Sequence, residues 1–232
     1  MSRDVRRALA AGLVLADGAM GTELAARGLD APFERFNLER PERVLDVHRA
    51  HLAAGARLLR SNTFLAPDAR TALAGARLAR EAAGEGILVA GALGPGTNAA
   101  AALAEGGCDL IVLETFLDPD ELIRAIRDAR ATGLPVMAQM AREPELRAVA
   151  TADVAGVNCV DADAAAGMVE KLVRDGGRPV SAFPHAGLPG RRVSPADFAR
   201  SAARLAKAGA RILGGCCGAG PEHVRALAKE VG

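Results

Sequence analysis

The feature that most constrains the fold of this chain is a regular alternation of short apolar runs with longer amphipathic segments rich in Ala, Arg and Glu. Such an alternation is typical of parallel strands joined by crossover helices. Strands are predicted over Leu13 to Ala16, Ala56 to Ser61, Ile87 to Ala92, Leu110 to Glu114, Pro135 to Gln139, Val154 to Asn158, Pro179 to Ala182 and Arg211 to Gly214. Helices are predicted over Glu42 to Ala54, Asp68 to Ala83, Pro119 to Ala131, Asp161 to Arg174, Pro195 to Ala208 and Pro221 to Val231.

Eight strand and helix units in one α/β chain favour a closed (β/α)8 barrel, the TIM barrel, over an open sheet. The chain has 232 residues, which is slightly below the ~250 usual for this barrel. The shortfall has a location, because only about a dozen residues separate the third strand from the fourth and the fifth from the sixth. We therefore expect one domain over residues 1–232, with shortened third and fifth βα connections.

Charge and hydropathy limit the kinds of partner. The 29 basic and 28 acidic residues are interspersed and give a net charge of +1, so neither a nucleic acid nor an anionic membrane is an expected partner. No apolar stretch reaches the ~18 to 20 residues that a membrane span requires. Three arginines precede the apolar run Ala8 to Ala16 and resemble the start of a secretory signal. This run is better used as a short helix and the first strand, so we expect a cytoplasmic protein that acts on small molecules.

Three of the four cysteines are predicted to meet at one end of the barrel. Cys159 directly follows the sixth predicted strand, and Cys216 and Cys217 lie in the Gly-Gly-Cys-Cys-Gly segment where the eighth strand ends. The carboxyl ends of all barrel strands share one face, so thiols that are far apart in sequence converge there. Cys108 precedes the fourth strand and belongs to the opposite face. In a reducing compartment such cysteines are metal ligands or buried thiols rather than disulfides.

Three thiols at one barrel face favour a catalytic metal site. One buried cysteine alone is ordinarily a small hydrophobic residue, but three protein ligands with an open fourth position are typical of catalytic zinc. Three thiolates on Zn²⁺ carry a net charge of −1, so a thiol that joins them is deprotonated while its sulfur stays electron-rich. That sulfur is suited to attack an electrophilic methyl group, and the uncharged thioether product is a poor ligand that can leave.

Six motifs in register resemble the homocysteine S-methyltransferase family, which includes betaine-homocysteine methyltransferase and the homocysteine-binding module of cobalamin-dependent methionine synthase. The resemblance covers nearly the whole chain, in a shortened form. The motifs are Asp17-Gly18-Ala19-Met20-Gly21-Thr22, Ser61-Asn62-Thr63-Phe64, Gly91-Ala92-Leu93-Gly94-Pro95, Leu113-Glu114-Thr115, Gly156-Val157-Asn158-Cys159, and Gly214-Gly215-Cys216-Cys217-Gly218 before Pro221-Glu222-His223.

The resemblance implies zinc on the three cysteines, and it implies that Asp17, Gly18 and Glu114 hold the amino-acid part of homocysteine. The chemistry of the two acidic residues agrees, because both end strands on the active face and a carboxylate is a natural partner for a substrate ammonium. The alternative is that these carboxylates cap the following helices or pair with an arginine.

His185 follows the seventh predicted strand, at a position where members of the family generally carry Asn. A neutral imidazole is a better zinc ligand than a carboxamide. We hypothesise that His185 fills the fourth zinc position until the substrate thiolate displaces it. The alternative is a hydrogen bond within its own loop or a contact with the substrate carboxylate.

The other histidines and two asparagines are given structural roles. His48, His51 and His223 are expected to occupy ordinary helical positions, and the helix that carries His48 and His51 is expected to lie outside the barrel, away from the cysteines. Asn62 and Asn158 are expected to brace loops by side-chain to backbone hydrogen bonds or to orient a zinc thiolate.

The sequence thus predicts a zinc-dependent S-methyltransferase that methylates homocysteine, or a related thiol or selenol, by direct displacement to form methionine. The sequence does not identify the methyl donor. The mouth loops are short and the chain has no Trp or Tyr, so only its six Phe residues could cage a quaternary ammonium donor. S-methylmethionine and methylcobalamin on a separate corrinoid protein are both compatible.

Two alternative interpretations assign the chain to other classes of function. The chain could be a zinc- and thiol-binding family member that has lost methyl transfer. It could also be an unrelated barrel enzyme, such as an aldolase, but this would require a lysine or a phosphate-binding loop at the strand ends. Lys171, Lys207 and Lys229 all fall on predicted helices.

Overall fold

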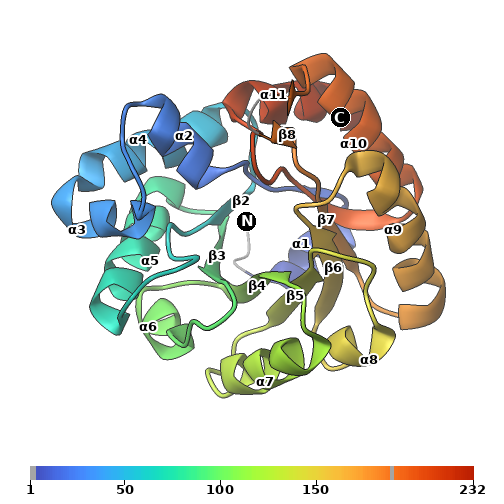
Figure 1. Cartoon of the computed structure of the whole chain (residues 1–232), viewed down its shortest axis with the longest axis horizontal. Coiled ribbons are helices and arrows are strands. Elements are labelled where there is room, and N and C mark those ends of the chain that lie inside the picture. The colour runs from blue at the N-terminus through green and yellow to red at the C-terminus, as the bar shows by residue number, and fades with distance from the viewer. Residues whose placement is uncertain (1–3, 189–190) are drawn as a thin grey trace.

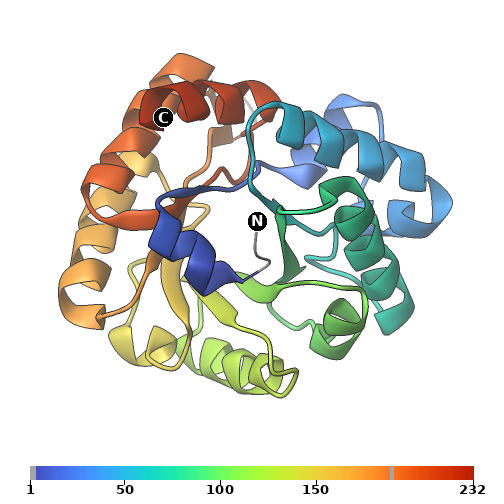
Figure 2. The same cartoon turned by 180° about the vertical axis from the view of Figure 1, so that it is seen from behind.

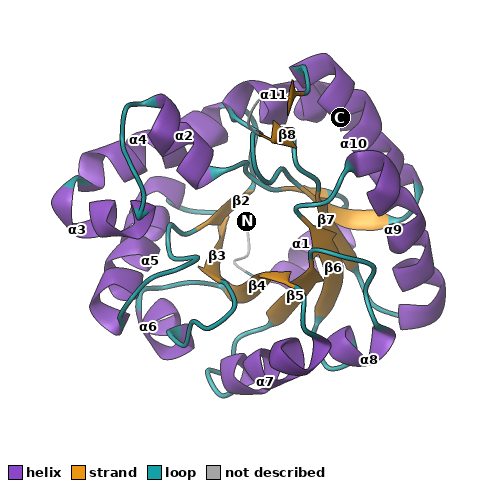
Figure 3. Ribbon diagram, viewed as in Figure 1, coloured by secondary structure: helices purple, strands orange, loops and turns teal. Residues whose placement is uncertain are grey.

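The computed structural model describes residues 4–188 and 191–232. Eight parallel strands form a ring in the order β1, β10, β7, β6, β5, β4, β3, β2, with helices around the outside (Figures 1 and 3). The ring closes between β1 and β2 through a parallel bridge from Ala16 to Leu58. The predicted (β/α)8 barrel is therefore confirmed. The strands are β1 (Val14–Leu15), β2 (Leu58–Arg60), β3 (Leu88–Leu93), β4 (Leu110–Phe116), β5 (Val136–Met140), β6 (Val154–Asn158), β7 (Val180–Phe183) and β10 (Ala210–Leu213).

The outer helices agree closely with the predicted ranges. Pro119 and Pro195 occupy the first turns of α7 and α10, and the side chains of Asp118 and Ser194 accept hydrogen bonds from the first-turn backbone N–H groups. The predicted helices are observed as α4 (Pro41–Ala53), α5 (Ala69–Ala83), α7 (Pro119–Arg130), α9 (Ala162–Gly176), α10 (Pro195–Lys207) and α11 (Pro221–Val231).

The third and fifth connections are short, as predicted. They contain only α6 (Ala100–Glu105), with 6 residues, and α8 (Leu146–Val149), with 4 residues. Other elements lie in two longer connections and were not predicted. These are α2 (Met20–Ala26), η1 (Phe33–Arg35) and α3 (Phe36–Glu39) between β1 and α4, and an antiparallel pair, β8 (Gly187–Leu188) and β9 (Arg191–Arg192), before α10.

The N-terminal end of the barrel is closed by α1 (Val5–Ala11), which crosses that end in Figure 2. Val5 is buried in the apolar cluster of the barrel interior, and Leu9 packs against that cluster. The apolar run near the N-terminus therefore forms a short helix and the first strand, as expected. None of the helices described in the structure is both long and apolar enough to cross a membrane.

The barrel interior changes from apolar to polar along the strand direction. Alternate residues of a strand face the same side, and Leu58, Val112 and Met137 belong to the interior apolar cluster. Two residues further on, the same strands carry Arg60, Glu114 and Gln139, all of which are buried. The strands thus place a layer of buried polar side chains at their carboxyl ends, beneath the cysteines.

Candidate active site

The three cysteines predicted to bind metal come together at the carboxyl ends of the strands. The thiol sulfur atoms of Cys159, Cys216 and Cys217 all lie within 4.8 Å of one another, and they are the one such group of metal-binding side chains among the described residues. The backbone N–H groups of Cys159 and Cys216 donate to carbonyl oxygens of Phe183 and Pro184 at 3.0 and 2.8 Å. Both loops are therefore fixed against the end of β7. Cys108 lies instead in the core cluster around the barrel.

The thiol cluster fits a tetrahedral metal ion. Zinc–sulfur bonds of ~2.3 Å place tetrahedral sulfur ligands ~3.8 Å apart, and the sulfur atoms of Cys159 and Cys217 are 3.6 Å apart. Hydrogen bonds from Cys159 and Cys216 lower the pKa of Cys217, whereas hydrogen bonding to Cys159 and Cys217, together with burial, raises the pKa of Cys216. One thiolate thus forms readily, and a divalent cation would favour the other two.

Two of the predicted motifs pack so closely that only glycine fits. A Cβ atom on Gly18 would lie 2.0 Å from the carbonyl oxygen of Ala219, and Gly218 has a left-handed φ of +80°. The backbone N–H of Ala19 donates to that same carbonyl at 2.8 Å. The Asp-Gly segment after β1 is thereby held against the loop that carries the paired cysteines.

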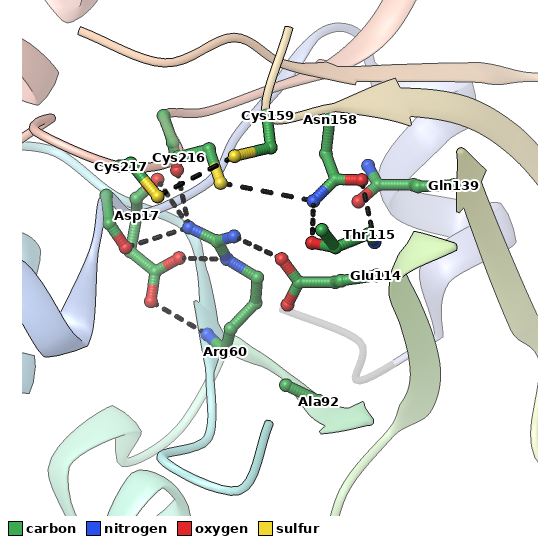
Figure 4. A network of polar contacts seen from close by, with 12 residues as sticks. Asp17, Arg60, Ala92, Glu114, Thr115, Gln139, Asn158, Cys159, Cys216 and Cys217 are labelled. Carbon is green, nitrogen blue, oxygen red and sulfur yellow. Dashed lines mark hydrogen bonds and ion pairs between the residues drawn. The ribbon is translucent and has the colours of Figure 1, made fainter. Parts of the chain in front are cut away.

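A buried arginine, Arg60, lies between the two acidic residues that were predicted to bind substrate (Figure 4). Its Nε and backbone N–H donate to the two carboxylate oxygens of Asp17, both at 2.8 Å, and its Nη1 donates to Oε2 of Glu114 at 2.7 Å. Its Nη2 donates to the carbonyl oxygens of Gly18 and Gly215 at 2.8 and 2.6 Å, with a longer contact of 3.4 Å to the carbonyl of Asp17. The guanidinium also lies 4.6 Å from the centre of the Phe183 ring.

These contacts hold three charges in one buried cluster. Burial lowers the pKa of Arg60, but Glu114 and Asp17 outweigh that effect and raise it, so the guanidinium stays charged. Burial raises the pKa of Glu114, and the Arg60 charge opposes that rise. The alternative expectation of pairing with an arginine therefore holds for both acidic residues.

A cavity of about 350 Å³ lies over this cluster. Its lining includes the three cysteines, Gly18, Arg60 and Glu114, together with Met20, Phe33, Glu34 and Phe64, but Asp17 is not part of it. A larger cavity of about 580 Å³ lies at the opposite end of the barrel, against α1, and the described residues that line it include no cysteine and no carboxylate. The chemistry therefore points to the smaller cavity.

Both predicted asparagines brace loops. Asn62 donates to the carbonyl oxygen of Phe33 at 2.9 Å. Asn158 accepts from the backbone N–H of Thr115 at 2.9 Å, and its Nδ2 lies 3.9 Å from the sulfur of Cys216. Asn158 thus braces its loop as expected, and its contact with the Cys216 sulfur is compatible with the expected role of orienting a zinc thiolate, which stays a prediction.

His185 lies beside the cysteines but makes a hydrogen bond within its own loop. Its Nδ1 accepts from the backbone N–H of Gly187 at 3.2 Å. Its own backbone N–H donates to the carbonyl oxygen of Val160 at 3.1 Å. The expectation that it fills a fourth zinc position stays a prediction.

The remaining histidines lie on helices, as expected. His48 and His51 on α4 are fully buried, and their ring nitrogens have no hydrogen-bond partner among the described residues. The helix is not remote from the site, because a Cβ atom on Gly18 would lie 2.9 Å from Cε1 of His51. His223 on α11 accepts at Nδ1 from the backbone N–H of Gly220.

Two charged residues of the site were not predicted. Arg60 ends the otherwise apolar Leu58–Arg60 strand, and a charge at the carboxyl end of a buried barrel strand was the feature that could have identified it. Glu34 lines the cavity from η1 and accepts a hydrogen bond from the backbone N–H of Leu65 at 2.9 Å. No motif around Glu34 indicated this position.

The fold and the site define a (β/α)8 barrel protein with a three-thiol centre at the carboxyl ends of its strands. The sequence model of the family described as homocysteine S-methyltransferase matches residues 14–231, and the chain belongs to this family. It is 29% identical to methionine synthase of Mycobacterium tuberculosis over 301 aligned positions, which cover 98% of this chain and 25% of that protein. It is 28% identical to betaine–homocysteine S-methyltransferase 1 of Danio rerio, over 83% of this chain and 66% of that protein.

A solved structure shares the fold. The apo form of the homocysteine methyltransferase MmuM from Escherichia coli superposes with a TM-score of 0.79 at 25% identity, over 94% of this chain and 96% of that one. The chain spans about a quarter of the length of the methionine synthases that it matches. The 301 aligned positions exceed the 232 residues of this chain, so that relative has segments that this chain lacks.

Proposed function

We propose that this chain is a zinc-dependent S-methyltransferase that transfers a methyl group to the thiol of homocysteine, or of a closely related thiol or selenol, and forms methionine. The observation that carries the proposal is the group of three thiols lining one cavity with the buried Glu114 carboxylate, in a member of this family. Thiols this close together need a reducing compartment, so we also propose a cytoplasmic location.

Cys159, Cys216 and Cys217 would hold the zinc, which when bound keeps the substrate sulfur deprotonated at neutral pH. The thiol proton passes to solvent. A sulfur lone pair then forms the new bond to the methyl carbon, while the bond from that carbon to the donor breaks and its electron pair leaves with the donor. The protein residues orient the thiol and keep the three cysteines together.

Glu114 is proposed to bind the substrate ammonium, and Gly18 to line the same part of the cavity. Oε1 of Glu114 makes no hydrogen bond to the described residues, whereas both oxygens of Asp17 are bonded to Arg60. We therefore assign Asp17 an indirect role, in which it fixes Arg60. The methyl donor would enter past Met20, Phe33 and Phe64, as a small molecule such as S-methylmethionine or on a separate corrinoid protein.

The direct test is to incubate the zinc-loaded chain and homocysteine with S-methylmethionine, betaine, methyltetrahydrofolate or methylcobalamin, one at a time, and to measure methionine. At least one donor should give methionine, and Cys217→Ala should abolish that activity. Homocysteine binding without turnover by any donor, including a corrinoid protein, would contradict the proposal. It would favour a zinc- and thiol-binding protein that has lost methyl transfer.

A further inference from the structure

The hydrogen bonds of Arg60 can be counted one by one. A guanidinium has five N–H groups. Nε donates one to Asp17, Nη1 donates one to Glu114, and Nη2 donates its two to the carbonyl oxygens of Gly18 and Gly215. One N–H of Nη1 is left without an acceptor among the described residues, and Arg60 lines the cavity.

The two carboxylates beside Arg60 differ in how many of their oxygens accept hydrogen bonds from it. Asp17 gives both oxygens to Arg60 and does not line the cavity. Glu114 gives Arg60 only Oε2 and lines the cavity, and Oε1 bears no dashed line in Figure 4. Two cavity-lining residues joined by a 2.7 Å ion pair thus each keep one group that the described residues do not use, a carboxylate oxygen on Glu114 and an N–H on Arg60.

We infer that Arg60 determines substrate specificity, by pairing with Glu114 to recognise an ammonium and a carboxylate carried on the same carbon. The inference rests on the proposed function, which places the substrate thiol at the cysteines. The ammonium binds Oε1 of Glu114, and the carboxylate binds the remaining N–H of Arg60. The substrate class is thus an α-amino acid thiol rather than a simple thiol.

The charge of the cluster supports this assignment. The formal charges of Asp17, Arg60 and Glu114 add to −1, and a zwitterionic head group leaves that sum unchanged. A substrate that lacks the amino group or the carboxylate leaves one buried charged group without its partner. Sites built from such groups reject analogues that cannot complete the hydrogen bonds.

The test measures thiol binding without a methyl donor. Zinc-loaded protein is titrated in a calorimeter with homocysteine, 4-mercaptobutyrate, 3-mercaptopropylamine and propanethiol, which present both charged groups, the carboxylate alone, the ammonium alone, or neither. We expect homocysteine to bind at least about tenfold more tightly than either thiol with one charged group, which corresponds to ~1.4 kcal/mol.

Two variants separate the two halves of the head-group site. Four side-chain N–H groups of Arg60 donate to other residues of the protein, whereas a lysine has only three N–H donors. Arg60→Lys should therefore leave no N–H donor for the substrate carboxylate. This variant should weaken homocysteine and 4-mercaptobutyrate about tenfold and leave the other two thiols unchanged. Glu114→Gln should instead weaken homocysteine and 3-mercaptopropylamine.

The matched control is Arg80→Lys, which changes the ion pair of Arg80 with Asp109, outside the cavity. It should leave thiol selectivity unchanged. Equal binding of homocysteine and the two single-group thiols by the unmodified protein would overturn the inference, as would an equal loss of all four thiols in Arg60→Lys with zinc retained. Either of these two results would leave the proposed function, methyl transfer to a thiol, intact. If the unmodified zinc-loaded protein bound none of the four thiols, the proposed function itself would fail.

Discussion

Asn158 holds Thr115 in a left-handed backbone conformation. Its Oδ1 accepts from the backbone N–H of Thr115 and its Nδ2 donates to the Thr115 hydroxyl, both at 2.9 Å, while Thr115 has a φ of +65°. A β-branched residue rarely adopts this conformation, so the bonds to Asn158 stabilise an unfavourable turn. The same amide group lies 3.9 Å from the sulfur of Cys216. One side chain thus links the strand that carries Glu114 to a thiol of the proposed zinc site.

We expect Asn158→Leu to reduce zinc affinity by ~10- to 100-fold, because partners that orient metal ligands have effects of that size. The variant should also lower the free energy of unfolding by ~1–3 kcal/mol, since the backbone N–H of the half-buried Thr115 loses its acceptor. Chelator competition and urea unfolding measure the two effects. Gln139→Leu is the control, because the fully buried Gln139 side chain has Ser181 as its one hydrogen-bond partner among the described residues. Equal losses of zinc affinity in both variants would contradict the assignment.

The barrel and the thiol cluster could be predicted because each depends on local patterns and one topological rule. Strand runs are recognised by their apolar residues, and the position of Cys159 and Cys217 at strand ends places them on the same face whatever the details of packing. The pairing of Arg60 with Asp17 and Glu114 could not be predicted in the same way. It depends on which inward-facing side chains of different strands lie at the same level along the barrel axis. The sequence alone does not specify that level.

The close approach of α4 to the site also could not be predicted from the sequence. Its position on the outside of the barrel follows from helical periodicity, but the absence of a Cβ atom at Gly18 lets His51 approach the loop after β1. The presence of a glycine in the sequence does not indicate which other residue packs against it. His48 and His51 lie on the predicted helix, and the close approach of His51 to the Gly18 segment was not part of the prediction, which concerned only the distance from the cysteines.

Replacing any of Cys159, Cys216 and Cys217 by Ala should release the one zinc ion expected per chain, because the remaining thiols no longer complete the coordination. Metal analysis after dialysis against a weak chelator measures the zinc content. Cys108→Ala is the control and should retain zinc, since Cys108 lies in the core cluster around the barrel. Full zinc content in the Cys216→Ala, Cys217→Ala double variant would show that the metal, if any, binds elsewhere.

Gly18→Ala should destabilise the protein by ~1–3 kcal/mol or more, because overpacked sites force the backbone to move. The added methyl group would lie 2.0 Å from the carbonyl oxygen of Ala219. Gly167→Ala is the matched control, since no atom lies within 4 Å of a Cβ at that position in α9. It should instead stabilise the helix by ~0.5–1 kcal/mol. Thermal unfolding of the two variants checks both signs, and similar stabilities would contradict the close packing at Gly18.

Acid should destabilise the protein through His48 and His51. Burial lowers the pKa of His48 to about 4 and that of His51 to about 3, from an ordinary 6.5. Below pH 6.5 the unfolded chain binds protons that the folded chain does not, so stability is fully present above that pH and falls toward pH 4. The slope is at most ~1.4 kcal/mol per pH unit for each imidazole. Urea unfolding from pH 7.5 to 4.5 should show a shallower slope for His48→Leu, and an unchanged slope would contradict the prediction.

His185 is expected to supply the fourth zinc ligand when no thiol substrate is bound. The loop on both sides of it is tied to the cysteines, because Cys216 donates to the carbonyl oxygen of Pro184 and Ala186 donates to that of Cys217, both at 2.8 Å. Because Nδ1 accepts from Gly187, a neutral ring carries its proton on Nε2, so ligation through Nε2 requires that proton to move to Nδ1 and the bond to Gly187 to break. X-ray absorption of the zinc-loaded, thiol-free protein should then show a nitrogen at ~2.0–2.1 Å beside sulfur at ~2.3 Å. The nitrogen should disappear in His185→Ala and on addition of homocysteine. A zinc coordination sphere that is identical in His185→Ala and the unmodified protein would rule out ligation, and would leave His185 with its hydrogen bond inside the loop.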